Sequence, residues 1–457
     1  MNREVLVKAV PLMVVSGLGL VFGLLREVSI AYGFGATWSS DTYFVAILPV
    51  LIVGALGTDI GVTMVPLYVR RQTEQGQQDA SLVFRRISLQ VSLGAAVLIG
   101  ATAAAASLWV PLVAPGMPEA SRHEAILLCW ILAPGTALIL PAMLWQAQAS
   151  AHHRFSMPQM ATYAPNLGII LAAVLLAGSV GVVGLAIGQT TGFLLQAALL
   201  WAAARGSEPE ARSVSTAGDD EHPIEMRAFL VTWGLVILGT LMSKFEPLLQ
   251  RYYASALGAG EISSLNYAQR ISFLPNVLFT TAVATVAFPR LSRLVLTDPG
   301  AFKRLLRVLI LVSVIALGAI AVLLFFTRAW VVSLLLGYGR FTGQDVVRTA
   351  SVLGCFCLTI VPIGLAIVLL RSVLVLQKAS YYAIGGIVSL AVWWWVAQAL
   401  VPTLGSGGLG VASAAGYLAL DAALVLGLWV GLRKQQVGSV VPTVESTEPV
   451  QLGGPSA

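Results

Sequence analysis

Long apolar stretches recur along almost the whole chain, and each is long enough to cross a lipid bilayer as a helix. A spanning helix needs about 20 apolar residues, because each residue advances the helix by about 1.5 Å. Short polar breaks separate twelve such stretches. We therefore expect an all-α polytopic membrane protein with about twelve transmembrane helices. The predicted spans are residues 8–32, 41–68, 87–113, 124–149, 157–178, 181–204, 228–253, 262–289, 306–334, 345–377, 380–401 and 408–432.

The scarcity of charged residues supports a membrane location. The sequence is 57% hydrophobic and 11% charged, whereas soluble domains carry about 25% charged residues. A soluble chain needs a charged exterior, and a chain surrounded by lipid does not. The net charge of +6 comes from basic residues beside the apolar stretches, so it reflects membrane topology and predicts no nucleic-acid partner. The cysteines Cys129, Cys355 and Cys357 lie inside apolar stretches and indicate neither a metal site nor a disulfide.

Lysine and arginine residues alternate between the loops on the two sides of the predicted membrane. One set of loops holds most of them, including the pairs Arg85–Arg86 and Arg290–Arg293. Basic residues collect in cytoplasmic loops, so we expect both termini to be cytoplasmic. One missing or extra span would break the alternation. The opposite loops hold only Arg122, Arg328, Arg340 and Arg348.

The twelve spans divide into two halves of six. The longest hydrophilic break, residues 206–227, is rich in Asp and Glu and follows the sixth span. We predict an N-terminal six-helix lobe at 1–205, a cytoplasmic linker at 206–227 and a C-terminal six-helix lobe at 228–434. The tail at 435–457 is rich in Val, Ser, Thr, Pro and Gly and is expected to be disordered.

The two halves also resemble each other in sequence near their first helices. With an even number of spans in each half, the two repeats would share one orientation and be related by an axis along the membrane normal. A transport pathway would then lie between the lobes. The alternative is that the match is a coincidence between two helical hairpins. At a constant offset of 223 residues, Ala31, Gly35, Ala36, Phe44, Pro66 and Arg70 match Ala254, Gly258, Ala259, Tyr267, Pro289 and Arg293.

Apart from the basic residues assigned to loops and span ends, four lie within predicted spans: Arg26, Lys244, Arg251 and Arg270. A charge at the centre of a bilayer costs about 2.5–3.5 kcal/mol on insertion scales. Such residues either snorkel or form ion pairs, for instance Arg26 with Asp41, or they line an aqueous pathway. Guanidinium groups bind phosphate oxygens in pairs, so a cationic pathway predicts an anionic substrate.

Acidic residues inside the spans suggest a second role. Asp421 is the lone acid of the last span, and Glu246 lies between Lys244 and Arg251. Coupled transporters use such carboxylates to carry Na⁺ or H⁺, although hydrogen bonding to a neighbouring Ser or Tyr would also explain Asp421. We find no nucleotide-binding P-loop, catalytic triad or metal motif. We therefore expect a transporter without a cofactor, driven by an ion or by the membrane potential.

Two segments carry a resemblance to a known family. GLLREVSIAYGFGATWSSDTYFVA (23–46) resembles the signature of the MurJ/MviN lipid-linked glycan flippases, in which an Arg-acid pair precedes FGA and a D-x-F/Y-F-V-A run. NYAQRISFLPNVLFTTAVATVAFPRLSRL (266–294) resembles the eighth helix of that family. The resemblance implies the multidrug/oligosaccharidyl-lipid/polysaccharide exporter fold, with two six-helix lobes in a V around a cationic cavity. It also implies that Arg26, Asp41 and Arg270 handle a lipid-diphosphate substrate in a bacterial cytoplasmic (inner) membrane.

The sequence departs from the family pattern in several places. Leu20 and the apolar residues 50–54 stand where the family carries arginines, and Phe273 stands where it often has an acid. We also expect no counterpart of the two extra C-terminal helices of the peptidoglycan flippases. These differences favour a polyprenyl-diphosphate-linked oligosaccharide for exopolysaccharide or surface glycan over lipid II. The expected partners are membrane lipids and the glycosyltransferases or polymerase of the same pathway.

Two other functions fit the sequence less well. A cation-coupled multidrug exporter of the same superfold would have a more acidic, aromatic cavity than this sequence predicts. A membrane glycosyltransferase or polymerase would have a large outer loop or paired acids on a cytoplasmic loop, and the predicted outer loops are short. The leading interpretation is a flippase that carries its substrate from the inner to the outer leaflet, with Arg26, Asp41, Lys244, Arg251 and Arg270 as its binding residues.

Overall fold

The computed structural model describes residues 3–152, 156–205, 245–376 and 379–438. Within these ranges the chain is helical and contains no strand. Lys244, the linker at 206–227 and most of the predicted tail lie outside the described residues. The last helix continues to Gly438, four residues beyond the predicted end of the C-terminal lobe.

The first half consists of helices α1 to α10. Breaks between consecutive helices fall where the next helix has a proline in its first turn. Pro49 lies in the first turn of α3, and Pro165 lies in the first turn of α9. Proline lacks the N–H that continues a helix, but it fits at a helix start. The helices are α1 (Arg3–Phe34), α2 (Trp38–Ala46), α3 (Leu48–Gln75), α4 (Gln77–Ala104), α5 (Ala106–Val113), α6 (Glu119–Ala137), α7 (Ile139–Ala151), α8 (Ser156–Ala161), α9 (Ala164–Leu175) and α10 (Val183–Arg205).

The first described helix of the second half covers residues 245–257. Its longest members, α12 and α13, have 37 and 38 residues, so each is about 55 Å long and exceeds the thickness of a bilayer. The remaining helices are α12 (Glu261–Thr297), α13 (Pro299–Leu336), α14 (Gly343–Phe356), the short η1 (Cys357–Thr359), α15 (Ile360–Val375), α16 (Ala379–Leu404) and α17 (Ser406–Gly438).

Nine stretches of the described residues are long and apolar enough to cross a membrane. Each overlaps one of the twelve predicted spans. Of the other three, 228–253 lies mostly outside the described residues, and 262–289 forms part of the continuous helix α12. The third, 157–178, was predicted as one helix but is divided into α8 and α9.

Burial within the nine stretches separates lipid-facing helices from interior ones. In the apolar window of Gly300–Leu336, 11% of the residues are buried in the protein, against 67% in Trp38–Thr58. Helix α13 therefore presents its apolar side chains to lipid, since water would penalise so large an exposed apolar surface. Helix α2 and the start of α3 instead pack inside the protein, next to the contact between the halves.

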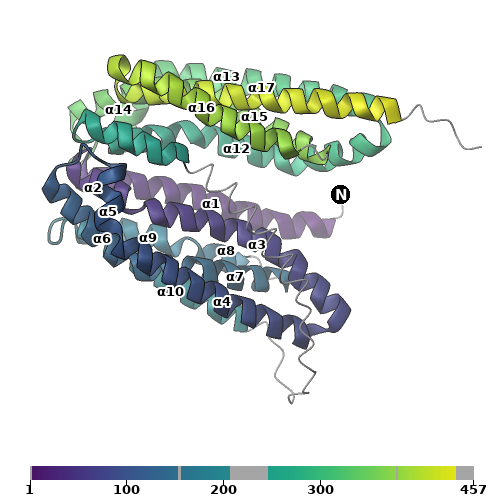
Figure 1. The fold of residues 1–457 in the computed structure, drawn as a ribbon, viewed down its shortest axis with the longest axis horizontal. Coiled ribbons are helices and arrows are strands. Elements are labelled where there is room, and N and C mark those ends of the chain that lie inside the picture. The colour runs from purple at the N-terminus through teal and green to yellow at the C-terminus, as the bar shows by residue number, and fades with distance from the viewer. Residues whose placement is uncertain (1–2, 153–155, 206–244, 377–378, 439–457) are drawn as a thin grey trace, which may run out of the picture.

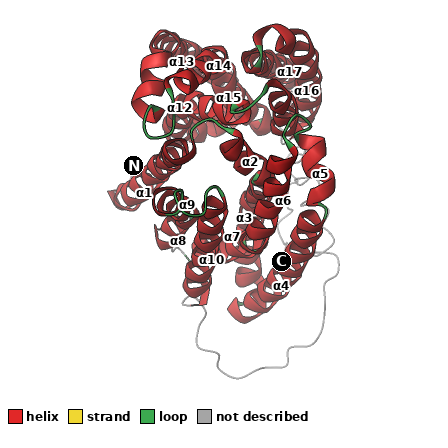
Figure 2. Ribbon diagram, turned by 90° about the vertical axis from the view of Figure 1, so that its left-hand side faces the viewer, coloured by secondary structure: helices red, strands yellow, loops and turns green. Residues whose placement is uncertain are grey.

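The two halves meet at one end and diverge toward the other (Figure 1). We call these the closed end and the open end. Helices α2, α5 and α14 lie at the closed end, and the view along the molecule shows α1 to α10 below α12 to α17 (Figure 2). The expected all-α fold with two groups of helices in a V is confirmed.

Residues that correspond in the sequence repeat touch each other at the closed end. Ser40 Oγ and Ser263 Oγ lie 2.9 Å apart, and their positions differ by 223. The rings of Phe44 and Tyr267, which also differ by 223, pack edge to face with centroids 5.6 Å apart. Equivalent residues face each other in this way only next to a two-fold axis. An approximate axis relating the two halves therefore passes between these pairs.

Candidate functional site

Arg26 lies near the closed end of α1 in a small polar cluster. One of its terminal nitrogens pairs with the Glu27 carboxylate, and Nη1 donates to Asn166 Oδ1 of α9 at 3.3 Å. The Glu27 side chain is 3% exposed and that of Arg26 is 23% exposed. Nearby, Tyr43 Oη of α2 donates to Gln189 Oε1 of α10 at 2.7 Å. Helices α1 and α9 together therefore hold a guanidinium group at a fixed place in the first half.

Arg270 reaches this cluster from the second half. It belongs to α12, and its Nη2 touches α1 where a Cβ atom of residue 23 would be, a position that Gly23 leaves empty. Arg26, Glu27 and Arg270 are close enough to interact electrostatically. Two of the three sequence-predicted arginines thus meet in one site, which α1 and α12 build from opposite halves.

The charges of this site are unbalanced. Two guanidinium groups face one carboxylate, which leaves one net positive charge. Arg26 Nε and Arg270 Nε are buried and have no hydrogen-bond partner among the described residues. Buried donors without a partner are costly, so the site favours an anion that accepts their hydrogen bonds. Phosphate oxygens suit guanidinium donors in both geometry and charge.

Because the Arg270 guanidinium lies against Gly23, a single methyl group added at residue 23 should have a strong effect on transport. We expect Gly23→Ala to reduce transport, because the new Cβ collides with the Arg270 guanidinium and moves it away from Arg26. The exchange should not weaken the helix, since alanine is favoured over glycine in helices by about 1 kcal/mol. The transport rate of the purified protein checks the expected loss of transport, and its thermal unfolding checks that the helix is not weakened.

Gly17 provides the matched control for this substitution. It lies on the same helix, and a Cβ there would have nothing within 4 Å. Gly17→Ala should keep the wild-type transport rate. Equal rates for both variants would show that the position of Arg270 against α1 does not matter.

Asp41 joins the two halves at the closed end. Its carboxylate caps the N-terminus of α12, because Oδ2 accepts from Gly260 N and Oδ1 from Ser263 N, both at 2.7 Å. Ser263 Oγ adds a third hydrogen bond at 2.5 Å. A carboxylate at a helix N-terminus satisfies free N–H groups and faces the positive end of the helix dipole. The ion pair suggested between Arg26 and Asp41 is wrong, since Arg26 pairs with Glu27.

Arg251 also lies in the contact between the halves. Its Nε donates to the carbonyl oxygen of Phe44 at 2.9 Å, and Nη1 donates to that of Pro247 at 3.0 Å. The residue is 5% exposed. Phe44 and Pro247 belong to different halves, so Arg251 ties them together and lies apart from the Arg26 cluster. Its predicted contact with substrate stays a prediction, as does that of Asp41.

The two acidic candidates lie inside the second half. Glu246 Oε1 accepts from Ser413 Oγ of α17 at 2.6 Å and from Gln250 Nε2 at 3.0 Å. Asp421 of α17 is 6% exposed, and neither carboxylate oxygen has a partner among the described residues. The two acids therefore differ sharply in how well their hydrogen bonds are satisfied.

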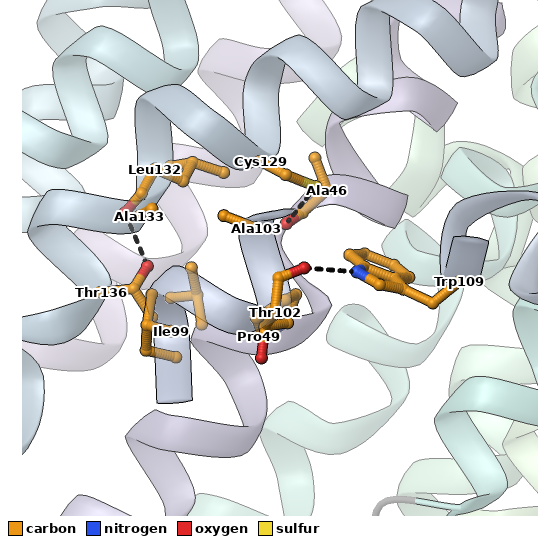
Figure 3. Close-up of a pocket in the computed structure, with 11 residues that line it drawn as sticks. Ala46, Pro49, Ile99, Thr102, Ala103, Trp109, Cys129, Leu132, Ala133 and Thr136 are labelled. Atoms are coloured by element: carbon orange, nitrogen blue, oxygen red, sulfur yellow. Dashed lines mark hydrogen bonds between the residues drawn. The ribbon is translucent and has the colours of Figure 1, made fainter. Parts of the chain in front are cut away.

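A separate apolar pocket lies within the first half. Ala46, Pro49, Thr102, Trp109 and Cys129 are among its lining residues (Figure 3). Its polar groups bond mostly to nearby backbone, as when Trp109 Nε1 donates to the Thr102 carbonyl at 3.0 Å. The pocket has no charged lining residue, so it does not suit an anionic head group.

Sequence reasoning did not select three residues of the site: Gly23, Glu27 and Asn166. Glu27 directly follows Arg26, and Asn166 is a polar residue in an otherwise apolar predicted span. Both were visible as polar residues where lipid-facing helices have none. Gly23 gave no such signal, because its importance depends on a side chain 247 positions away that only the fold brings to it.

Comparison with known proteins decides the family. Residues 30–446 match the family described as "Lipid II flippase MurJ". The chain belongs to the lipid II flippase MurJ family. A MurJ relative from Burkholderia cenocepacia is 27% identical over 441 residues, which cover 93% of this chain and 84% of the relative. A probable lipid II flippase MurJ of Thermotoga maritima is 24% identical over 414 residues. It is matched over 80% of its own length, and the match covers 87% of this chain.

Solved structures agree on the fold. A structure described as lipid II flippase MurJ in an inward closed conformation aligns with a TM-score of 0.75 at 18% identity, over 95% of this chain and 93% of that one. An inward-facing multidrug resistance MATE family transporter aligns with a TM-score of 0.72 at 15% identity, over 93% and 96%. The exporter superfold implied by the sequence resemblance is thereby confirmed.

Proposed function

We propose that this chain is a flippase for a polyprenyl-diphosphate-linked glycan, with the diphosphate bound between Arg26 and Arg270. The observation that carries the proposal is the meeting of these two guanidinium groups from opposite halves. Among the described residues, Glu27 is the one acid that balances them. The unused Nε–H of each arginine supplies a donor for phosphate oxygens. MurJ relatives with the name lipid II flippase support a lipid-linked substrate.

The shape of the molecule supports transport by alternating access. The halves diverge at the open end and are held together at the closed end by Asp41, Arg251 and the Ser40–Ser263 contact. In the proposed cycle, the charged head enters at the open end and binds Arg26 and Arg270. It crosses from the inner to the outer leaflet when the halves rock, while the polyprenyl tail stays in lipid.

The recognised part of the substrate is the diphosphate. Leu20 and residues 50–54, where the family carries arginines, offer no further charge to the rest of the head. We therefore infer that the chain accepts a lipid-linked oligosaccharide, such as an exopolysaccharide or surface-glycan precursor, and that lipid II is one member of the substrate class. Glycosyltransferases that build such lipids are the expected pathway partners, and the bacterial inner membrane is the expected location.

The test is transport by the purified protein in phospholipid vesicles. Fluorescently labelled lipid II is placed in one leaflet, and its arrival in the other is read with a quencher that cannot cross the membrane. We expect transport to be inhibited by excess polyprenyl-diphosphate oligosaccharide and unaffected by a lipophilic cationic dye. Transport of the dye, with no movement of either lipid-linked diphosphate, would favour the multidrug exporter and overturn the proposal.

A further inference from the structure

An aromatic pair lies next to the two arginines, on the side of the open end. The rings of Phe22 in α1 and Tyr163, the residue before α9, stack with their centroids 5.7 Å apart and 26° between their planes. Phe22 precedes Arg26 by four residues, so both lie on one face of α1. Phe22 and Tyr163 are both half-buried. The pair therefore leaves part of its ring surface accessible beside the proposed head-group site.

Two glycines of α1 receive the tips of side chains from other helices. A Cβ atom at Gly19 would lie 2.8 Å from Cε1 and 3.2 Å from Oη of Tyr163, and one at Gly23 would meet Nη2 of Arg270. Gly19 and Gly23 are one turn apart on the same face of α1, about 6 Å along the helix axis. The Tyr163 phenol and the Arg270 guanidinium group therefore occupy consecutive turns of this face.

The segment that carries Tyr163 turns polar groups toward α1. Asn166, three residues after Tyr163, accepts a hydrogen bond from Arg26 Nη1 at 3.3 Å. The Tyr163 hydroxyl reaches α1 at Gly19, nearer to the open end. A surface that faces only lipid has no use for such groups. Tyr163 and Asn166 thus extend the polar surroundings of Arg26 along α1.

The position of the arginines determines where the rest of the head group lies. Helix α1 begins at the open end and ends at the closed end (Figure 1). Beyond Arg26 and Arg270 the halves are joined, because Asp41 caps α12 and Arg251 donates to the Phe44 carbonyl. A glycan whose diphosphate is held by the arginines must therefore extend toward the open end. Its first sugar is bonded directly to the diphosphate, so it lies about one helical turn away, beside Tyr163.

An aromatic ring with a hydroxyl group suits a sugar in both shape and polarity. The C–H groups on one face of a pyranose ring are apolar and slightly positive, and the face of an aromatic ring is negative. The hydroxyl groups around the sugar ring exchange hydrogen bonds with a phenol, which is both donor and acceptor. A polyprenyl chain would use the ring surface alone. The presence of the Tyr163 hydroxyl therefore favours a sugar over the lipid tail.

We propose that Phe22 and Tyr163 form the subsite for the first sugar of the lipid-linked glycan. The proposal rests on the proposed flippase function and adds a second point of recognition to the diphosphate. Contact with a C–H face does not depend on one particular substituent. The subsite therefore distinguishes a polyprenyl diphosphate that carries a sugar from one that carries none, and it tolerates different sugars.

The test measures binding of lipid-linked diphosphates to the purified full chain. Fluorescently labelled lipid II is the probe. Its competitors are undecaprenyl diphosphate, which has no sugar, and undecaprenyl diphosphate with one N-acetylglucosamine, which has one sugar and no peptide. Wild type should bind the competitor with the sugar several-fold more tightly. Tyr163→Leu should bind that competitor about 3- to 10-fold more weakly than wild type does, since it loses the ring and the hydroxyl. Its affinity for the sugar-free competitor should be unchanged.

A pair of glycine substitutions tests the same subsite while keeping the aromatic ring. Gly19→Ala places a methyl group against the Tyr163 ring and should reduce the preference for the sugar. Gly17→Ala, where a Cβ has nothing within 4 Å, should keep it. Tyr252→Leu, which removes an exposed tyrosine of the second half, should also keep it.

The outcomes separate the sugar subsite from the proposed function. Folded Tyr163→Leu and Gly19→Ala proteins with the wild-type preference would overturn the subsite. Equal weakening of both competitors by Tyr163→Leu would assign the ring to the polyprenyl chain and would also overturn it. Arg26→Ala should weaken both competitors equally and keep the preference for the sugar. If wild type bound neither competitor, the proposed function itself would be contradicted.

Discussion

Arg26→Ala and Arg270→Ala should each reach the membrane in normal amounts and lose most of their transport of lipid-linked diphosphate. Each arginine is expected to give charge-assisted hydrogen bonds to the head group. Such bonds contribute about 1.5–3 kcal/mol, so each loss should slow transport by about 10- to 100-fold. The transport of labelled lipid II in vesicles measures this effect. Removal of either arginine leaves one guanidinium group and the Glu27 carboxylate, so both variants lose the net positive charge of the site.

Lysine replacements and a distant arginine make this test specific. Arg26→Lys and Arg270→Lys keep the charge but lose the two-pronged donor geometry, and they should retain an intermediate rate. Arg304→Ala removes an exposed arginine from the first turns of α13, far from the site, and should behave like wild type. If Arg26→Ala and Arg270→Ala transported at the wild-type rate, the head group would have to bind elsewhere.

A covalent link across the closed end should stop transport completely. Ser40 Oγ and Ser263 Oγ are 2.9 Å apart on opposite halves, so Ser40→Cys combined with Ser263→Cys should form a disulfide on oxidation. Alternating access requires these residues to separate, and the link forbids it. The transport rate before and after oxidation, measured on one preparation, checks the prediction.

The controls for this experiment use the chain's own cysteines. Cys129, Cys355 and Cys357 are free in the structure, and their replacement by alanine gives a background in which only the engineered pair can react. Addition of a reducing agent should restore transport, and each single cysteine variant should be insensitive to oxidation. A fully cross-linked protein that still transports would exclude separation of the halves at this end.

The sequence predicted the fold well because one physical property dominates it. A membrane helix must be apolar over about 20 residues. The spans can therefore be recognised from the local amino-acid composition, and so can the alternating charges of the loops between them. The break between α8 and α9 was missed for the same reason. Residues 157–178 are mostly apolar, with Gln159 and Asn166 among the exceptions, and their hydropathy alone does not show where the helix is interrupted before Pro165.

The site was predictable only in part. Arg26 and Arg270 were identifiable because a charge within an apolar span needs an explanation. The contact between Arg26 and Asn166 was not, since a hydrogen bond between distant segments leaves no local pattern. Asp41 illustrates the limit most clearly. Its partners are largely backbone N–H groups of Gly260 and Ser263, and every residue except proline carries such a group, so its role as a helix cap had no sequence signal.

The capping of α12 by Asp41 also shows that the two sequence repeats differ in how their helix N-termini are capped. Helix α2 satisfies its own start, because Ser40 Oγ accepts from Thr37 N at 3.0 Å. The corresponding residues of the second half are Gly260 and Ser263, and they take their acceptor from Asp41 in the first half. The counterpart of Asp41 is Ser264, whose hydroxyl is buried without a partner among the described residues. Two copies of the second half, paired with each other, would leave both helix starts uncapped. The halves have therefore lost the ability to substitute for one another, and a working molecule needs one of each.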